Sequence, residues 1–190
     1  MLEQSGVNGT ILSLQQPSPV TDITAFSHVK DPLLLQFLTY YLNLRQGDRV
    51  PRRGQVSPMD FPRLLSNVFL YECDTTAQDF HLRLAGSQVA ELLQTVKAGT
   101  KMSDVFPPDV FPIVLQRYRR ICTELVVMHN IGKVFHLMGG TGMGERIAMP
   151  LLDNAGVPSF IIGATVYTLP KHEIHVPPGR EPQIVTYTPL

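Results

Sequence analysis

Between residues 31 and 169 the hydrophobic pattern changes several times from helical spacing to the alternation of strands. The clearest helix is predicted over 31–46, because Asp31 can cap it and Pro32 suits its first turn. Apolar residues then recur at steps of three and four, so the helix is apolar on one side. These positions are Leu34, Phe37, Leu38 and Tyr41. This stripe must be covered, either by the rest of the domain or by a second subunit.

Two strands and a run of helices are predicted next. The segment 67–73 is rich in branched and aromatic residues, and 80–84 alternates apolar with polar residues. A short polar turn joins them, so they form a hairpin in which Glu72 and Arg83 can pair across the strands. Helical segments are expected at 59–66, 87–93 and 103–106.

The longest of the middle helices is predicted to follow Pro107 and Pro108, with Asp109 as its cap. Its apolar residues recur on one side. The arginines of 117–120 are expected to lie on its solvent-exposed face.

Three further strands are expected at 125–137, 145–152 and 159–169, the first with a bulge near Gly132. This order predicts an α+β fold, in which a five-stranded antiparallel sheet carries helices on one face and is preceded by the amphipathic helix. Residues 1–30 form a flexible arm and 170–190 a Pro-rich tail, which leaves 31–169 as the single domain.

Composition narrows the classes of partner and compartment. The chain has 190 residues, with 16 basic and 16 acidic side chains, so it carries no net charge that would attract nucleic acid. No signal peptide opens it and no apolar run is long enough to cross a bilayer. Cys73 and Cys122 lie far apart and are expected to be reduced thiols. The protein is therefore expected to be cytoplasmic, with no membrane contact.

Several segments, in this order, resemble a divergent bacterial family of single-domain PAS proteins. They are Tyr-Tyr-Leu-Asn-Leu-Arg-Gln-Gly at 40–47, Val-Pro-Arg-Arg at 50–53, Phe-Pro-Arg-Leu-Leu at 61–65, Asp-Phe-His-Leu-Arg-Leu-Ala-Gly-Ser at 79–87, Met-Pro-Leu at 149–151 and Ile-Ile-Gly-Ala at 161–164. The resemblance implies a sensory or signalling module. It transfers no shared chemistry, residue by residue.

The sequence contains no recognisable motif for binding a cofactor or a metal ion, or for catalysis. The glycines of 139–144 precede a strand and lack a following Gly-Lys-Ser/Thr, so they read as a turn and not as a phosphate loop. No histidine occurs in 87–121 to ligate haem, and no Asn-Cys-Arg motif is present for flavin. His129 and His136 are expected on opposite faces of one strand. No nucleophile has a recognisable partner. We expect no cofactor, no metal and no enzymatic activity.

The candidate ligand pocket lies where the long helix should meet the inner face of the sheet. Seven side chains are expected to converge there, namely Phe106, Phe111, Tyr118, Ile147, Met149, Phe160 and Ile162. The same residues would form the core of any such domain, and a filled core is favoured over an open pocket. The leading hypothesis is a module that binds a small apolar ligand, a protein partner or both. The alternatives are a structural adaptor or dimerisation domain with no ligand and, last, a small enzyme.

A second candidate surface is the apolar stripe of the 31–46 helix, which Leu34, Phe37, Leu38 and Tyr41 form. We expect a homodimer built on this helix, with the signal passed to a separate protein partner that the sequence does not identify.

Overall fold

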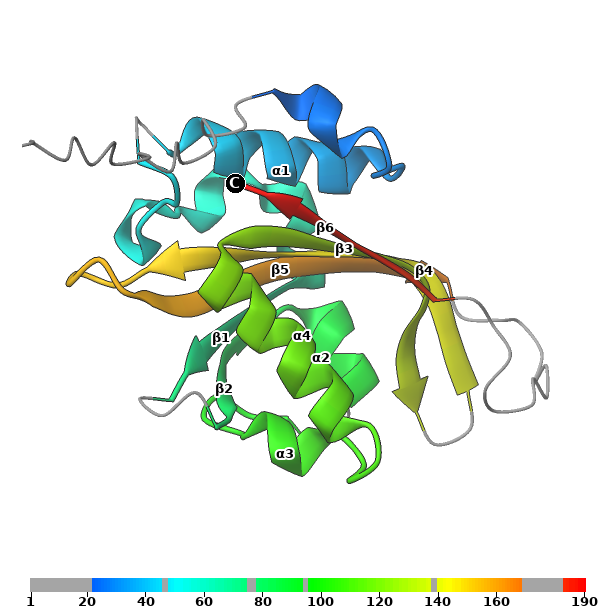
Figure 1. Ribbon diagram of the computed structural model, residues 1–190. Helices are drawn as coiled ribbons and strands as arrows, with labels where there is room; N and C mark the ends of the chain where they lie inside the picture. Colours follow the sequence, from blue (N-terminus) through cyan, green and yellow to red (C-terminus); the bar gives the residue numbers. More distant parts are fainter. Residues whose placement is uncertain (1–21, 46–47, 75–77, 94–95, 138–139, 169–182) are drawn as a thin grey trace, which may run out of the picture.

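The fold is a six-stranded antiparallel sheet with helices on both faces, as Figure 1 shows. In the computed structural model the sheet has the strand order β2-β1-β5-β4-β3-β6. The strands are β1 (Val68–Cys73), β2 (Phe80–Ala85), β3 (Val126–Leu137), β4 (Gly140–Leu152), β5 (Pro158–Thr168) and β6 (Ile184–Pro189). The structure describes residues 22–45, 48–74, 78–93, 96–137, 140–168 and 183–190. The predicted α+β class is confirmed, with one strand more than expected.

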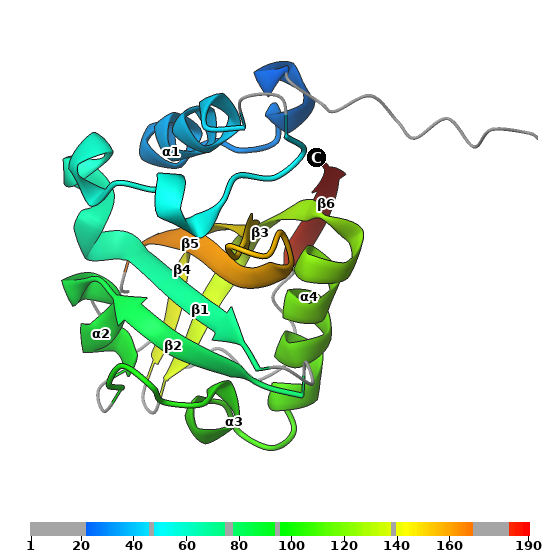
Figure 2. The same cartoon turned by 90° about the vertical axis from the view of Figure 1, so that its left-hand side faces the viewer.

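The helices form two separate layers, which Figure 2 shows edge-on to the sheet. One layer holds α2 (Ser87–Leu93), α3 (Met102–Val105) and α4 (Phe111–Glu124). The opposite face carries α1 (Pro32–Asn43) together with the short 3-10 helices η1 (Ile23–Phe26), η2 (Arg53–Gln55), η3 (Pro58–Asp60) and η4 (Pro62–Asn67). The helix expected at 59–66 is therefore two 3-10 pieces, since Pro58 and Pro62 each begin one.

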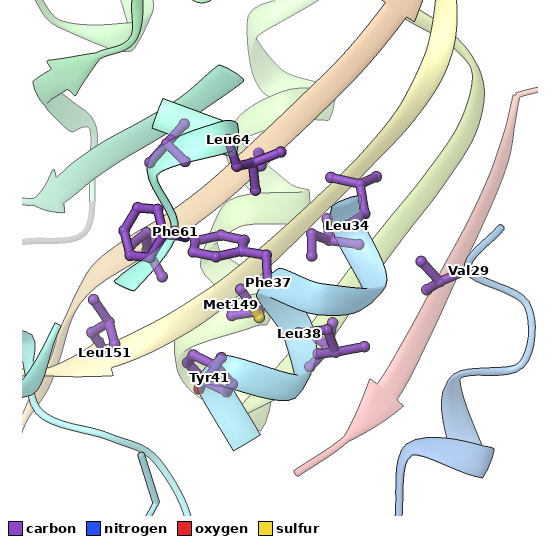
Figure 3. Packing of buried hydrophobic residues seen from close by; sticks show 14 of the residues in the cluster. Val29, Leu34, Phe37, Leu38, Tyr41, Phe61, Leu64, Met149 and Leu151 are labelled. Carbon is purple, nitrogen blue, oxygen red and sulfur yellow. The ribbon is translucent and has the colours of Figure 1, made fainter. Parts of the chain in front are cut away.

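Helix α1 begins as the sequence predicts. The backbone N–H groups of Leu33 and Leu34 donate to Asp31 Oδ1 at 2.8 and 3.1 Å. The apolar stripe packs on the chain's own sheet beside Met149 and Leu151, as Figure 3 shows. Its four residues are at most 1 % exposed, namely Leu34, Phe37, Leu38 and Tyr41. These side chains cannot contact a second subunit, so the stripe is core and not the expected partner surface. The homodimer itself stays a prediction.

The last residues of the chain form strand β6, where the sequence predicted only a tail. β6 pairs with β3 from Val126↔Pro189 to Ile131↔Ile184. Helix α4 holds it from the side, because the guanidinium of Arg120 lies 4.1 Å from the centre of the Tyr187 ring. Arg120, one of the arginines of 117–120, thus contacts β6 and not only solvent. The other expected tail residues, 170–182, lie outside the described residues.

The described part of the expected N-terminal arm is also packed. Phe26 in η1 is fully buried and Val29 is 2 % exposed, and both belong to the core on the α1 side. The boundary of the folded domain therefore lies before residue 31. Residues 1–21 lie outside the described residues.

A bulge in β3 sets which side chains of the β3–β4 hairpin share a face. Phe135 pairs with Gly142, but Lys133 pairs with Met143, so Val134 is the extra residue. The bulge expected at Gly132 is present two positions later, and Gly132 itself has a φ of 109°. A register shift of one residue exchanges the faces of every following side chain. It is this shift that places Glu145 on the same face as His129.

Candidate functional site

The structure does not bring the seven predicted pocket residues together. Phe106, Phe111 and Tyr118 pack in the core under α4, whereas the other four pack in the core under α1. These four are Ile147, Met149, Phe160 and Ile162. Strand residues alternate between faces, so Ala148 and Ile161 are the ones that face α4. The predicted pocket therefore combined side chains from both faces of the sheet. The residues of β4 and β5 that face α4 are one position away from those expected.

Aromatic rings occupy the centre of the α4 side, where a ligand was expected. The rings of Tyr71, Phe80 and Phe69 have their centres 5.6, 5.7 and 6.4 Å from that of Tyr118. Gly163 allows this packing, since a Cβ there would lie 2.2 Å from the Phe69 ring. The distances of 5.6 to 6.4 Å between the ring centres are those of packed aromatic pairs. On this side the filled-core alternative fits the structure better than an open pocket.

A cavity of about 240 Å³ opens on the other face, between α1 and η4, and we call it the α1–η4 cavity. The ring of Phe61 lies at 4.9 Å from Phe37 and at 5.3 Å from Tyr40, between ring centres. Figure 3 shows Phe37 and Phe61 side by side. The lining residues are Leu33, Gln36, Phe37, Tyr40, Asp60, Phe61, Pro62, Arg63 and Leu64. The cavity is apolar inside and has charged groups in its lining.

The polar groups around the α1–η4 cavity fix its shape. The hydroxyl of Tyr40 accepts a hydrogen bond from the backbone N–H of Ser57 at 2.9 Å. Burial raises the pKa of Tyr40, and the neighbouring Asp60 carboxylate adds to that increase. Tyr40 is therefore neutral at physiological pH and ties α1 to the segment that leads into η3. Met59, next to the lining residue Asp60, is 81 % exposed.

A buried polar cluster lies beside the N-terminus of α1 and was not predicted as a site. His129 on β3 and Glu145 on β4 are 2 % and 6 % exposed, and His129 Nε2 lies 2.7 Å from Glu145 Oε1. Glu145 also accepts the backbone N–H groups of Lys30 and Asp31 at 2.7 and 2.9 Å. This carboxylate therefore anchors the segment that enters α1.

The signal for this cluster was present in the sequence but not interpretable without the register. The sequence relates His129 only to His136, whose side chain lies outside the described residues. Within the described part of the chain, no three His, Cys, Asp or Glu side chains are placed to hold a metal ion. His172 and His175 lie outside it. The Glu72–Arg83 pair, by contrast, forms across the first hairpin as predicted.

A second, wider hollow of about 480 Å³ lies beyond the N-terminus of α1. Its lining includes Asp31, Ile131, Met143, Glu145 and Val166. Both carboxylates already accept hydrogen bonds from the backbone of this chain. The hollow is thus an apolar depression beside the polar cluster, and its acidic groups are engaged in the fold.

No helix among the described residues has the length and apolar character needed to cross a membrane.

Comparison with known proteins identifies the family. A family model described as PAS domain matches residues 29–166, which includes α1, the middle helices and strands β1 to β5 up to Val166. A search of curated proteins found no match. The matched region has the strand and helix order that the segment resemblances implied. The chain belongs to the PAS domain family.

Proposed function

We propose that this PAS domain is a signalling module that binds a separate protein, and that this partner inserts an apolar side chain into the α1–η4 cavity. The family supports a sensory or signalling role in general. The observation that carries the finer proposal is the apolar α1–η4 cavity, whose lining residue Asp60 directly follows Met59, an apolar residue that is 81 % exposed. The proposal includes no catalytic step.

The size of the cavity favours a side chain over a free ligand. Pockets that enclose drug-sized ligands span about 300–1,000 Å³. The α1–η4 cavity, at about 240 Å³, is smaller and suits a single anchoring residue. Protein interfaces concentrate their binding energy in such anchors, which fill well-packed pockets. Met59 would extend the contact beyond the mouth of the cavity.

Packing on the α4 side supports the same choice. The rings around Tyr118 fill the space that a small apolar ligand would need. On that face, the packing therefore favours an adaptor with a filled core over a module that binds a small apolar ligand. An occupant of the α1–η4 cavity would touch Phe37 and Leu64, which are both core residues, so binding can be transmitted to the sheet.

The test places a photo-crosslinking amino acid at Met59 and, as a control, at Ile113, which is 52 % exposed on α4. We expect a cross-linked protein of different mass at Met59 only. With that protein purified, Met59→Asp should weaken binding about tenfold, because a charge would replace an apolar contact next to the cavity, and Ile113→Asp should leave binding unchanged. Equal cross-linking at both sites, a cross-link only to a second copy of this chain, or unchanged binding by Met59→Asp would each overturn the proposal.

A further inference from the structure

The polar cluster beneath residues 22–31 holds the N-terminal segment on the sheet, and we call this segment the N-terminal latch. Its apolar side chains Phe26 and Val29 are buried in the core, Val29 beside β6 (Figure 3). Its polar attachment is Glu145, which accepts the backbone N–H groups of Lys30 and Asp31. The same carboxylate contacts His129. Latch, β3 and β4 therefore meet at one buried carboxylate.

The hydrogen bonds of this cluster leave one buried ring nitrogen of His129 without a partner among the described residues. Glu145 accepts hydrogen bonds from two backbone N–H groups and also lies against His129 Nε2. The other ring nitrogen of His129 is Nδ1. That Nδ1 is buried and has no hydrogen-bond partner among the residues that the structure describes.

His28, on the latch, covers His129. The two rings have their centres 4.9 Å apart and are tilted by 56°. His28 Nε2 is likewise buried without a hydrogen-bond partner in the described parts of the chain. Burial lowers the pKa of His28, and repulsion from His129 lowers it further, whereas the Glu145 carboxylate opposes both effects. A proton on His28 would thus introduce a charge at a buried nitrogen that has no acceptor, next to a second imidazole.

The other charged groups near His28 do not offset this. Lys30 adds to the repulsion, and its ammonium group donates to the backbone oxygen of Ser27 at 2.7 Å. Asp31 accepts from the first turn of α1. On β6, the residue opposite His129 is the uncharged Thr186. Glu145 is the one carboxylate that faces the rings from the adjacent strands within the described residues, and two backbone N–H groups and the His129 ring already contact it.

We propose that the N-terminal latch is acid-sensitive: it is docked while His28 is neutral and leaves the sheet when His28 takes up a proton. Free histidine titrates near pH 6.5, and docking favours the neutral ring. The contribution of His28 to docking is therefore complete above about pH 6.5 and decreases as the pH falls below that value. Release would expose the sites of Phe26 and Val29 and free the amides of Lys30 and Asp31 at the start of α1.

The test follows hydrogen exchange of the Lys30 and Asp31 amides in the full chain, corrected for the intrinsic rate, between pH 7.5 and 5.5. We expect their protection to fall in the wild type, by at most about tenfold for the linkage of one histidine, while β1 amides stay protected. His28→Phe should remove the pH dependence. The matched control is His81→Gln on β2, at the other end of the sheet from the cluster, which should behave as the wild type.

Two results would overturn the latch. One is protection of these amides that does not change with pH in the wild type, or that falls equally in His28→Phe. The other, which needs no variant, is an NMR titration of the wild type in which the His28 ring has its midpoint at or above the value of free histidine, about 6.5. This second measurement decides the matter even if His28→Phe fails to fold.

Discussion

Gly163 lies in the middle of β5, where there is no room for a side chain. A Cβ at this position would lie 2.2 Å from the Phe69 ring and 2.5 Å from the backbone oxygen of Ile147. The glycine is needed for space, because the Phe69 ring lies over Gly163 on the face of the sheet where it packs with Tyr118. A single missing side chain thus permits the aromatic packing of the whole α4 side.

We therefore expect Gly163→Ala to destabilise the protein by about 1–3 kcal/mol, the usual cost of overpacking a core. Urea unfolding followed by far-UV circular dichroism measures this change. Gly54→Ala is the matched control, since a Cβ there meets nothing within 4 Å, and its effect should stay within about 0.5 kcal/mol. Equal effects of the two substitutions would contradict the assigned role of Gly163.

Asp153 organises the turn between β4 and β5. Its Oδ1 accepts the backbone N–H groups of Ala155 and Val157, both at 2.9 Å, and its Oδ2 accepts the hydroxyl of Ser159 at 2.9 Å. The hydrogen bond from the Val157 N–H lowers the pKa of Asp153 the most, and the one from Ser159 lowers it further. The turn is therefore held by the ionised form of the side chain.

A carboxyl group whose pKa is lower in the folded state stabilises the protein above its ordinary value of 3.8, and this contribution is lost as the pH falls through the folded pKa. We expect Asp153→Ala to melt at a lower temperature than the wild type near neutral pH. The difference should shrink once the pH is below the folded pKa. Thermal melts of both proteins across this range measure it, and a difference that is constant with pH would contradict the prediction.

At the scale of elements, the two long helices begin in different ways. Asp31 caps α1 with two hydrogen bonds from backbone N–H groups. Asp109, predicted to cap α4, does not do so: Val110 occupies the cap position and no side chain bonds to the helix end. The first turn of α4 is instead closed by Pro107, whose oxygen accepts from the N–H groups of Val110 and Phe111 at 2.9 and 2.8 Å.

This difference predicts different costs for the same substitution. Asp31→Ala should destabilise the protein by about 1 kcal/mol, the typical value of a lost helix cap. Asp109→Ala, at an exposed position, should have an effect within about 0.5 kcal/mol. Chemical denaturation of the two variants provides the comparison. A larger effect at Asp109 than at Asp31 would show that the cap assignment is wrong.

Most of the elements could be predicted from the sequence because their signals are local. The cap and spacing of α1 and the alternation in β2 are examples, and both elements lie within a few residues of their expected bounds. The candidate site depends on register, which is not local. Without the extra residue Val134, Glu145 would pair with Gly132 and face away from His129. The sequence suggests a bulge in β3, but its exact position decides which polar groups meet.

At the scale of the whole molecule, segments that the sequence predicted to be a flexible arm and a tail pack on the sheet. The N-terminal latch covers one side of the sheet beside α1, and β6 extends the opposite edge from β1 and β2. Both lie partly or wholly outside the 29–166 region that the family model matches. Phe26 and Val29 of the latch and Leu190, which follows β6, are buried in the core that α1 covers, so the stability of that core depends on segments flanking the family region.

Leu190 tests this dependence most directly. Its side chain is 1 % exposed and packs in the core on the α1 side. Its backbone N–H donates to the Leu125 oxygen at 3.1 Å, and its own oxygen accepts from Arg49 Nε at 2.6 Å. We expect Leu190→Ala to destabilise the protein by at least about 2 kcal/mol, the lower end of the range for a buried leucine. Ile184→Ala, at the other end of β6 and 58 % exposed, is the control and should change the free energy of unfolding little. If the two variants unfold at the same urea concentration as the wild type, β6 packs on the sheet without contributing to its core.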